Sequence, residues 1–352
     1  MVTARRFISD VAIDDIGCIM ICAICGGTGG GRLARGISYI CNPAVLTYIC
    51  NVGDNIRLFG LTICPDIDTV IYYLSDTADY GRGWGLHAES FNFLERLRLF
   101  SPDFWFGLGD KDLATHVWRS ELLRNGLSLS EVTTREAHLC GVRSRIIPAT
   151  DSWVKTQIET VSHSRLHYEE YFIRLKCEPH VSQVCYEGIE DARPACGVLE
   201  AIASSSTIII APSNPVASIL PIISVPGVRE ALVRNREKVW AISPVIEGLA
   251  LPAGERMRAR SRERLLASLG LPHNPISVGQ LYRDFCTHSV LDERDFEYAP
   301  QLEEMGYDVY LLKTDALTFE RQGELARDLL QLTGDLDRVD FGPLSREHIT
   351  RG

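Results

Sequence analysis

Three aspartates in the first third of the sequence each lie just beyond a predicted strand. Asp54 follows the apolar run 46–52, and Asp66 and Asp68 follow Pro65. In a parallel α/β sheet, the residues just past the carboxyl ends of strands line the ligand crevice. Carboxylates there can hold Mg²⁺, which prefers oxygen ligands and bridges to substrate phosphates. Spacing leaves a structural role equally open, in which Asp68 caps the next helix and Asp54 occupies a turn.

A glycine-rich segment, residues 26–31, follows the apolar run 19–25 and precedes a segment of helical character, 32–40. Glycines let backbone N–H groups approach a phosphate closely, and the N-terminus of the following helix is positive. The spacing is neither that of a Walker loop nor a full G-x-G-x-x-G. The segment predicts a phosphate-binding loop, with a purely architectural tight turn as the alternative.

Two later segments also carry polar side chains that could bind a ligand. Lys111 lies between two aspartates in the segment 107–112, where it is either a solvated turn residue or a point charge for a ligand oxygen. Ser213 and Asn214 follow the apolar run 207–211 and could either bond a ligand or form an ordinary turn. The histidine spacing does not indicate zinc, and no G-x-S-x-G elbow is present.

Composition narrows the class of protein. The 352 residues suffice for one large domain or two, and 45% hydrophobic with 23% charged residues excludes disorder for most of the chain. A net charge of −10 leaves no basic footprint for nucleic acid, and no apolar run reaches the roughly 18 residues that span a bilayer. The 11 cysteines, an odd number mostly in apolar runs, favour reduced thiols in a cytoplasmic protein, and the Cys22-x-x-Cys25 pair is read as core.

Short apolar runs alternate with helical segments, which predicts an α/β fold with a Rossmann-like, mainly parallel sheet flanked by helices. Residues 142–190 are richer in strand pattern and predict a smaller β-rich inserted subdomain. Residues 1–17 are expected to be an N-terminal extension and 334–352 a C-terminal tail. Strands are expected at 19–25, 46–52, 61–64, 145–148, 154–161, 171–175, 207–211, 239–243 and 309–312, and helices at 32–40, 69–77, 84–100, 113–125, 256–269 (a basic helix) and 320–332.

Five segments, in order along the chain, resemble signatures of the 2-phospho-L-lactate transferases, the CofD family. They are residues 25–36, 51–55 with 65–70, 105–116, 212–219 and 243–245. The resemblance runs from about residue 19 to 333, so the segment 18–333 is expected to be a CofD-like transferase domain. Five ordered matches are more specific than one glycine-rich segment.

The resemblance implies an enzyme of coenzyme F(420) biosynthesis. Such an enzyme takes a guanosine diphospho-ester of 2-phospho-L-lactate, phosphoenolpyruvate or a close three-carbon analogue. It transfers the phospho-acid unit to the ribityl hydroxyl of the deazaflavin Fo (7,8-didemethyl-8-hydroxy-5-deazariboflavin), and GMP leaves. Family enzymes use Mg²⁺. We therefore expect small-molecule substrates and neither nucleic acid nor membrane as a partner; a homodimer stays open.

The resemblance also implies roles for individual residues. Asp54 and Asp66 match metal positions, Asp54 and Asp68 catalytic positions, and Asp68 and Lys111 positions that contact Fo. The guanosine donor is expected to lie against a further set of matched residues: Gly26, Gly27, Thr28, Gly29, Ser213 and Asn214.

Some residues depart from the family's pattern, mostly near the expected donor. Asn55 and Arg32 stand where relatives often have aspartate and lysine, and Ser152 replaces a usual aspartate. The segment 252–257 lacks the Lys-Gly or Ser-Gly that commonly precedes the matching Gly-Pro-Ala in the family. The departures bear on which three-carbon acid is used.

Two other classes of function stay open. A nucleotide-sugar-binding regulator of the gluconeogenesis-factor type would share the fold without catalysis, but the retained Asp54, Asp66–Asp68 and 109–112 motifs favour the transferase. A nicotinamide oxidoreductase needs an acidic ribose ligand about 20 residues after the glycine-rich segment, and Asp54 lies somewhat far from it.

Overall fold

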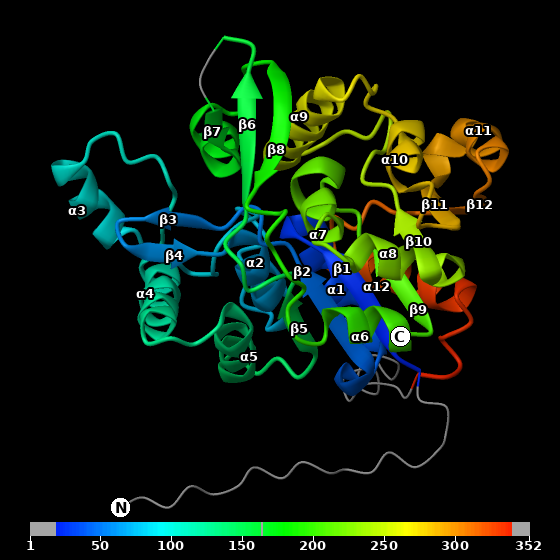
Figure 1. Ribbon diagram of the computed structural model, residues 1–352, viewed down its shortest axis with the longest axis horizontal. Helices are drawn as coiled ribbons and strands as arrows, with labels where there is room; N and C mark the ends of the chain where they lie inside the picture. Colours follow the sequence, from blue (N-terminus) through cyan, green and yellow to red (C-terminus); the bar gives the residue numbers. More distant parts are fainter. Residues whose placement is uncertain (1–18, 163–164, 340–352) are drawn as a thin grey trace, which may run out of the picture.

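The computed structural model describes residues 19–162 and 165–339 (Figure 1). The expected N-terminal extension, 1–17, and most of the expected tail, 334–352, lie outside this part of the chain. Within the described residues a seven-stranded sheet lies at the centre, and all its neighbouring strands pair in parallel. The predicted Rossmann-like α/β fold is therefore confirmed.

The strand order of the central sheet is β12-β11-β10-β9-β1-β2-β5. The chain first moves outward from β1 to β2 and β5, then returns to β9 beside β1 and moves out on the other side. The order thus reverses between β1 and β9, and ligands of open α/β sheets bind at such a switch point. The strands are β1 (Ile21–Cys25), β2 (Leu46–Cys50), β5 (Arg145–Pro148), β9 (Thr207–Ile210), β10 (Val239–Ile242), β11 (His288–Asp292) and β12 (Asp308–Leu312).

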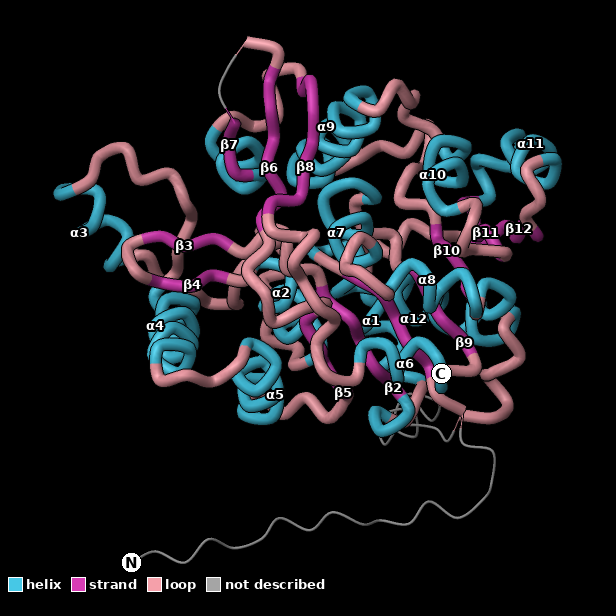
Figure 2. Tube along the Cα trace, in the orientation of Figure 1, coloured by secondary structure: helices cyan, strands magenta, loops and turns pink. Residues whose placement is uncertain are grey.

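Helices cover the central sheet because its strands are apolar on both faces. The strands β1, β2, β9 and β10 are buried along their whole length. Helix α1 packs against α2 and α12. The helices α6 and α8 form a separate packed pair beside the sheet (Figure 2). The helices are α1 (Gly27–Ile40), α2 (Pro65–Leu74), α3 (Asn92–Phe100), α4 (Asp110–Arg124), α5 (Leu129–Leu139), α6 (Val198–Ser204), α7 (Leu220–Ile223), α8 (Val228–Arg234), α9 (Ala253–Ser268), α10 (Pro275–Tyr282), α11 (Ala299–Glu304) and α12 (Phe319–Leu332).

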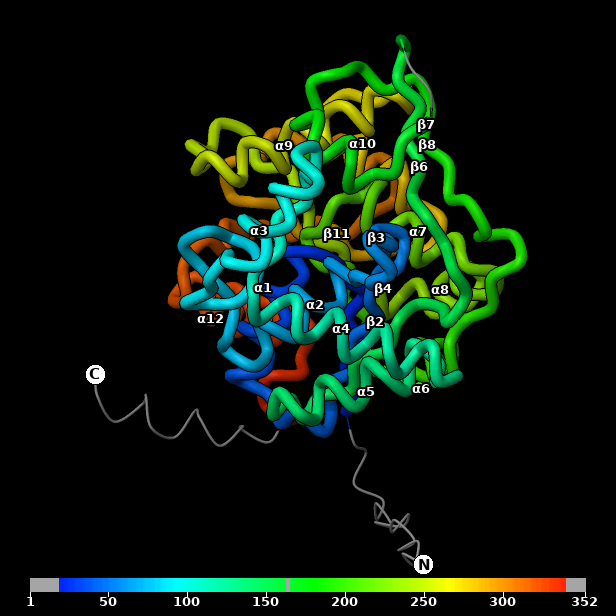
Figure 3. The backbone as a smooth tube through the Cα atoms, turned by 90° about the vertical axis from the view of Figure 1, so that its left-hand side faces the viewer, coloured from blue at the N-terminus to red at the C-terminus, as the bar shows by residue number. Residues whose placement is uncertain are grey.

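Two small antiparallel sheets lie outside the central one. The strands β3 (Ile56–Leu58) and β4 (Leu61–Ile63) form a hairpin, so the expected strand at 61–64 is not part of the parallel sheet. The predicted β-rich insertion contains the second small sheet: β7 (Arg165–His167), β6 (Lys155–Thr160) and β8 (Val181–Glu187). This sheet extends beyond the central sheet in the side view (Figure 3). The expected strand at 171–175 is wrong, since Glu170–Arg174 forms a π-helical turn.

Several helix boundaries differ from the prediction. Helix α1 begins at Gly27, so most of the predicted glycine loop is the first turn of this helix. Helix α2 begins at Pro65 with Cys64 as its N-cap, so Asp68 lies in its first turn and does not cap it. Of the expected helix at 84–100, the part from Asn92 onward is helical.

The cysteines are free thiols in the described part of the chain, as expected, and Cys22 and Cys25 are buried in the core. No single described helix is long and apolar enough to cross a membrane. The segments Pro215–Ile223 and Val228–Arg234 meet the length and composition requirement together, but they are bent by 87° relative to each other.

Candidate active site

A cavity of about 580 Å³ lies at the switch point between β1 and β9. Its lining includes the start of α1, the residues that follow β2 and β9, the first turn of α2 and one side of α9. The small sheet β6–β8 contributes the segment that follows β7, including Tyr168 and Glu169. The carboxyl ends of the central strands thus form the floor of a cavity, as expected for this class of fold.

The start of α1 is held against β9 by Ser213. Its hydroxyl donates to the Gly26 carbonyl (2.7 Å) and accepts from the Gly26 amide (3.2 Å). Gly27 has a φ of +60°, which L side chains rarely adopt. A Cβ on Gly29 would overlap the Pro212 carbonyl oxygen, and one on Gly26 would overlap the Asp66 carboxylate. The glycines are therefore required by packing within the protein, and they also line the cavity.

Of the buried carboxyl groups that line the cavity, Asp54, Asp66 and Glu169 influence one another's pKa. Burial raises the pKa of Asp54, and the neighbouring Asp66 and Glu169 raise it further. Burial raises the pKa of Asp66 to about 6 even though hydrogen bonds, including one from Asn51 Nδ2 at 2.9 Å, favour its ionised form. The pKa of Glu169 is raised to about 8, first by burial and then by Asp66.

These carboxyl groups could hold a divalent cation. Asp54 Oδ1 has no hydrogen-bond partner among the described residues although it is buried. Adjacent buried carboxylates repel one another, and a cation with oxygen ligands removes this cost. Asp54 and Asp66 were predicted as metal positions. The sequence analysis missed Glu169 because this residue belongs to the inserted segment, more than 100 residues after Asp54 and Asp66, and no local pattern marks it.

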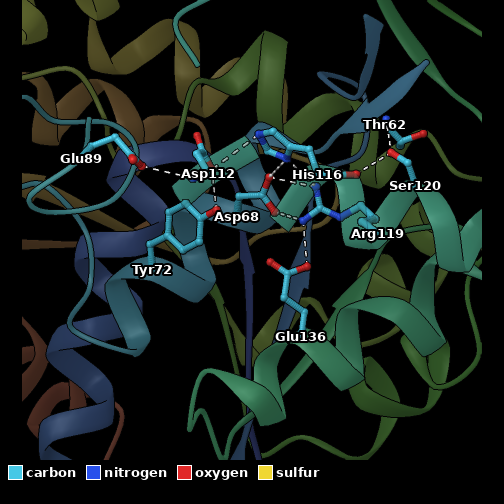
Figure 4. Close-up of polar contacts among 9 residues, drawn as sticks. All are labelled: Thr62, Asp68, Tyr72, Glu89, Asp112, His116, Arg119, Ser120 and Glu136. Atoms are coloured by element: carbon cyan, nitrogen blue, oxygen red, sulfur yellow. Dashed lines mark hydrogen bonds and ion pairs between the residues drawn. The ribbon is translucent and has the colours of Figure 1, made fainter. Parts of the chain in front are cut away.

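Asp68, in contrast, belongs to a buried ion-pair network (Figure 4). Arg119 on α4 donates to both oxygens of Asp68, with Nη1 3.0 Å from Oδ2, and to Glu136 Oε2 at 2.8 Å. His116 lies between Asp68 and Asp112, with its ring nitrogens 3.7 and 3.5 Å from their carboxylates. Asp68 still lines the cavity, but its charge is balanced within the protein.

A second set of acidic residues at the cavity, around Asp68, is a weaker candidate for a cation site. Ligand atoms of Asp68, Asp112 and His116 lie within 4.8 Å of one another. However, Asp68 is paired with Arg119, and Asp112 accepts a hydrogen bond from Tyr72 Oη at 2.6 Å. A cation would compete with these partners, so the group that includes Asp54 is the better fit.

Arginines line another part of the cavity, and the sequence analysis did not assign them. Arg32 on α1 and Arg258 on α9 both pair with Glu255 at 2.9 Å. Arg262 lies one turn after Arg258 and also lines the cavity. Arg258 and Arg262 are four residues apart on a predicted basic helix, so they lie on the same helix face. This spacing could have identified them from the sequence as a pair of candidate anion-binding residues. Arg32, which stands where relatives often have lysine, is thus paired with Glu255 of the segment 252–257, which also departs from the family's pattern.

The remaining predicted residues differ in position. Thr28 and Asn214 line the cavity, and Asn214 Nδ2 donates to Ser261 Oγ on α9 at 3.3 Å. Lys111 is exposed and donates to the His87 carbonyl at 3.0 Å. It is not among the described residues that line the cavity, although the next residue, Asp112, is. Fo contact by Lys111 therefore stays a prediction.

Comparison with known proteins identifies the family. The family described as 2-phospho-L-lactate transferase CofD matches residues 21–284. The chain belongs to the CofD family. It is 35% identical to the 2-phospho-L-lactate transferase of Methanosarcina mazei, over 87% of this chain and 98% of the relative. It is 34% identical to the phosphoenolpyruvate transferase of Streptomyces coelicolor, over 94% of this chain and 97% of the relative.

A solved structure supports the fold of this CofD member. A Bacillus halodurans protein of the UPF0052 family superposes with a TM-score of 0.56 at 16% identity, covering 88% of this chain and 99% of that one. Membership of the CofD family makes the chain a transferase and favours this class over a nicotinamide oxidoreductase or a non-catalytic regulator.

Proposed function

We propose that this CofD protein transfers a phospho-three-carbon-acid unit, 2-phospho-L-lactate or phosphoenolpyruvate, from a guanosine diphospho-ester to the ribityl hydroxyl of Fo. Both acids appear in the names of its relatives. The carrying observation is that, in a CofD-family chain, one cavity combines arginines, glycine backbone and uncompensated carboxylates. These are the groups that binding a phosphate ester and a divalent cation requires.

In the proposed reaction, the Fo hydroxyl oxygen attacks the phosphorus that carries the acid. A new P–O bond forms, the bond to the bridging oxygen breaks, and GMP leaves with that oxygen. The hydroxyl proton passes to the carboxylate of Asp54, since Glu169, with a pKa of about 8, keeps its own proton at neutral pH. Asp68 is held by Arg119, and we assign it to orienting the acceptor hydroxyl.

We propose that Asp54 and Asp66 hold Mg²⁺, with Glu169 as a third carboxylate nearby. When bound there, Mg²⁺ would neutralise charge on the phosphoryl oxygens. The start of α1 and Ser213 would bind the nucleotide phosphates, and Asn214 would orient the nucleotide side. The aromatic side chains of Trp84, Trp105 and Phe106 line the same cavity and offer flat surfaces for the deazaflavin ring.

A donor panel tests the proposal. The protein is incubated with Mg²⁺, Fo and each guanosine diphospho-ester, and mass spectrometry follows both the phosphorylated deazaflavin and GMP. We expect equimolar formation of both products with at least one donor. Absence of both products with every donor contradicts the transferase, and binding of GDP without Fo would instead favour the regulator.

The variant Asp54→Asn should lower kcat/KM more than a hundredfold, because losing about 3 kcal/mol of transition-state stabilisation has this effect. Its fold should remain intact, since Asp54 Oδ1 has no partner to lose among the described residues. Thermal melting is the control. If Asp54→Asn turns over at the wild-type rate at saturating Mg²⁺, Asp54 is not a metal ligand.

A further inference from the structure

Arg262 differs from the other arginines near the cavity. Arg119 is fully buried but paired with two carboxylates, and Arg32 and Arg258 share Glu255. Within the described residues, Arg262 makes no hydrogen bond or ion pair, and its Nε is buried without a partner. Its side chain nevertheless lines the cavity. The Nε–H of this partly buried side chain is thus removed from water without a hydrogen-bond partner, which costs free energy.

The surroundings of Arg262 contain a second unpartnered group. His273 also lines the cavity, and its Nε2 is buried without a partner in the described structure. Burial lowers the pKa of His273, and Arg262, which lines the same cavity, lowers it further. Burial also lowers the pKa of Arg262 to about 10, against the opposing effect of Glu255. Arg262 Nε and His273 Nε2 therefore both lack a hydrogen-bond partner among the described residues.

Arg262 lies on the expected nucleotide side of the cavity. The preceding residue, Ser261, is bonded to Asn214 Nδ2 at 3.3 Å and to Tyr168 Oη at 2.9 Å. Arg258, one turn earlier, donates to the Gly83 carbonyl at 2.7 Å, the same oxygen to which Thr28 Oγ1 donates at 3.4 Å. Helix α9 therefore presents its arginines beside the start of α1, where the donor's phosphates are proposed to bind.

We propose that Arg262, with His273 beside it, binds an oxyanion of the guanosine donor. This inference rests on the proposed function for the identity of the ligand. The oxyanion is either the outer phosphate or the carboxylate of the three-carbon acid, since a guanidinium binds both through paired N–H donors. The bound oxyanion supplies the partner that Arg262 lacks in the protein.

Calorimetry on Arg262→Gln tests the site, with Arg260→Gln as the matched control. Arg260 lies on the same helix, is exposed and does not line the cavity. We expect Arg262→Gln to weaken binding of the acid-bearing ester at least tenfold, and Arg260→Gln to change it less than twofold. An equal loss for GDP places the outer phosphate at Arg262, whereas unchanged GDP binding places the carboxylate there.

Thermal melting separates binding from folding. Because Arg262 has no partner in the protein, the ligand-free Arg262→Gln variant should melt at or above the wild-type temperature. Unchanged affinity for both ligands, or a lower melting temperature of the ligand-free variant, overturns the inference.

Pyrophosphate is a third probe and contains no guanosine. Suppose that the wild type binds pyrophosphate but not GDP, and that Arg262→Gln weakens the binding of pyrophosphate. This result refutes the proposed donor and supports the oxyanion site. Conversely, normal transfer to Fo by Arg262→Gln keeps the proposed function and removes the site.

Discussion

The buried carboxyl group of Glu169 leads to a prediction about the stability of the protein that can be tested without any substrate. Glu169 is buried, and no hydrogen bond to its carboxyl group contributes to its pKa, which lies at about 8 instead of 4.5. In the native state the group keeps its proton above pH 4.5, whereas the unfolded chain releases it. Stability should therefore fall as pH rises from about 4.5 to 8, because the unfolded state binds fewer protons.

The variant Glu169→Gln removes this ionisation while keeping the shape of the side chain. Raising the pKa from 4.5 to about 8 costs about 5 kcal/mol of unfolding free energy once Glu169 is ionised, as an upper limit. With an unfolding entropy of about 2.1 cal/mol/K per residue, a chain of 352 residues gains about 6 °C in melting temperature at pH 8.5. At pH 5 the unfolded chain has only begun to release this proton, so the two melting temperatures should lie within about 1 °C of each other.

The assay is thermal melting in EDTA and in Mg²⁺ at both pH values. At pH 8.5, Mg²⁺ should stabilise the wild type more than Glu169→Gln, because the cation offsets the charge that the variant lacks. Glu170→Gln is the matched control: its carboxylate is half-buried and pairs with Arg174 at 2.7 Å on the surface. If Glu169→Gln melts below the wild type at pH 8.5 in EDTA, then Glu169 has a stabilising partner and the reasoning is wrong.

Three further variants test other parts of the site. Lys111→Ala should weaken Fo binding and leave GDP binding unchanged in separate titrations, and equal losses would contradict a role toward Fo. Arg119→Met should lower stability by about 3–5 kcal/mol in denaturant unfolding, because it leaves buried carboxylates unpaired, and a smaller loss would mean that they become protonated. Gly29→Ala should lower the melting temperature of the ligand-free protein because its Cβ overlaps a backbone carbonyl, and an unchanged temperature would show that the loop can shift.

The sequence predicted six of the seven central strands, because burial on both faces leaves a clear signal in most of them, and missed β11 (His288–Asp292). Strands such as Ile21–Cys25 and Thr207–Ile210 are continuous apolar runs bounded by glycine or proline. The segment 171–175 has a similar apolar pattern, yet it forms part of a π-helical turn against the core of the inserted sheet. Short apolar runs do not separate a strand from a buried helical turn, and tertiary packing decided this case.

The start of α1 shows how packing overrides local preference. Glycine disfavours helix, so a glycine-rich segment is more readily predicted as a loop. In the structure the helix begins at Gly27, and its first turn is glycine-rich because Asp66 and the chain after β9 leave no space for side chains there. A side chain at Gly29 therefore clashes within the protein itself, so substitutions there are expected to affect stability as well as any bound ligand.

The site was predictable only in part, for a related reason. Asp54 follows the central strand β2, so the rule about carboxyl ends finds it, whereas Asp66 follows β4 of the antiparallel hairpin and reaches the cavity from the first turn of α2. The pairing of Asp68 with Arg119 joins residues 51 positions apart, and Glu169 comes from an inserted sheet. No spacing rule connects such residues, because their proximity is created by the fold.

The charge distribution of the cavity links the two proposals. The carboxylates come from the chain after β2 and from the inserted sheet, whereas Arg258 and Arg262 come from the chain after β10, on the other side of the switch point. A diphosphate that binds the arginines also approaches the carboxylates, which repel it unless a cation lies between them. Donor and Mg²⁺ must then increase each other's affinity by the same factor, as linkage requires. Arg262 Nε and Asp54 Oδ1 lack a hydrogen-bond partner among the described residues, and under the two proposals their partners arrive with the substrate: an oxyanion for the arginine and a cation for the carboxylate.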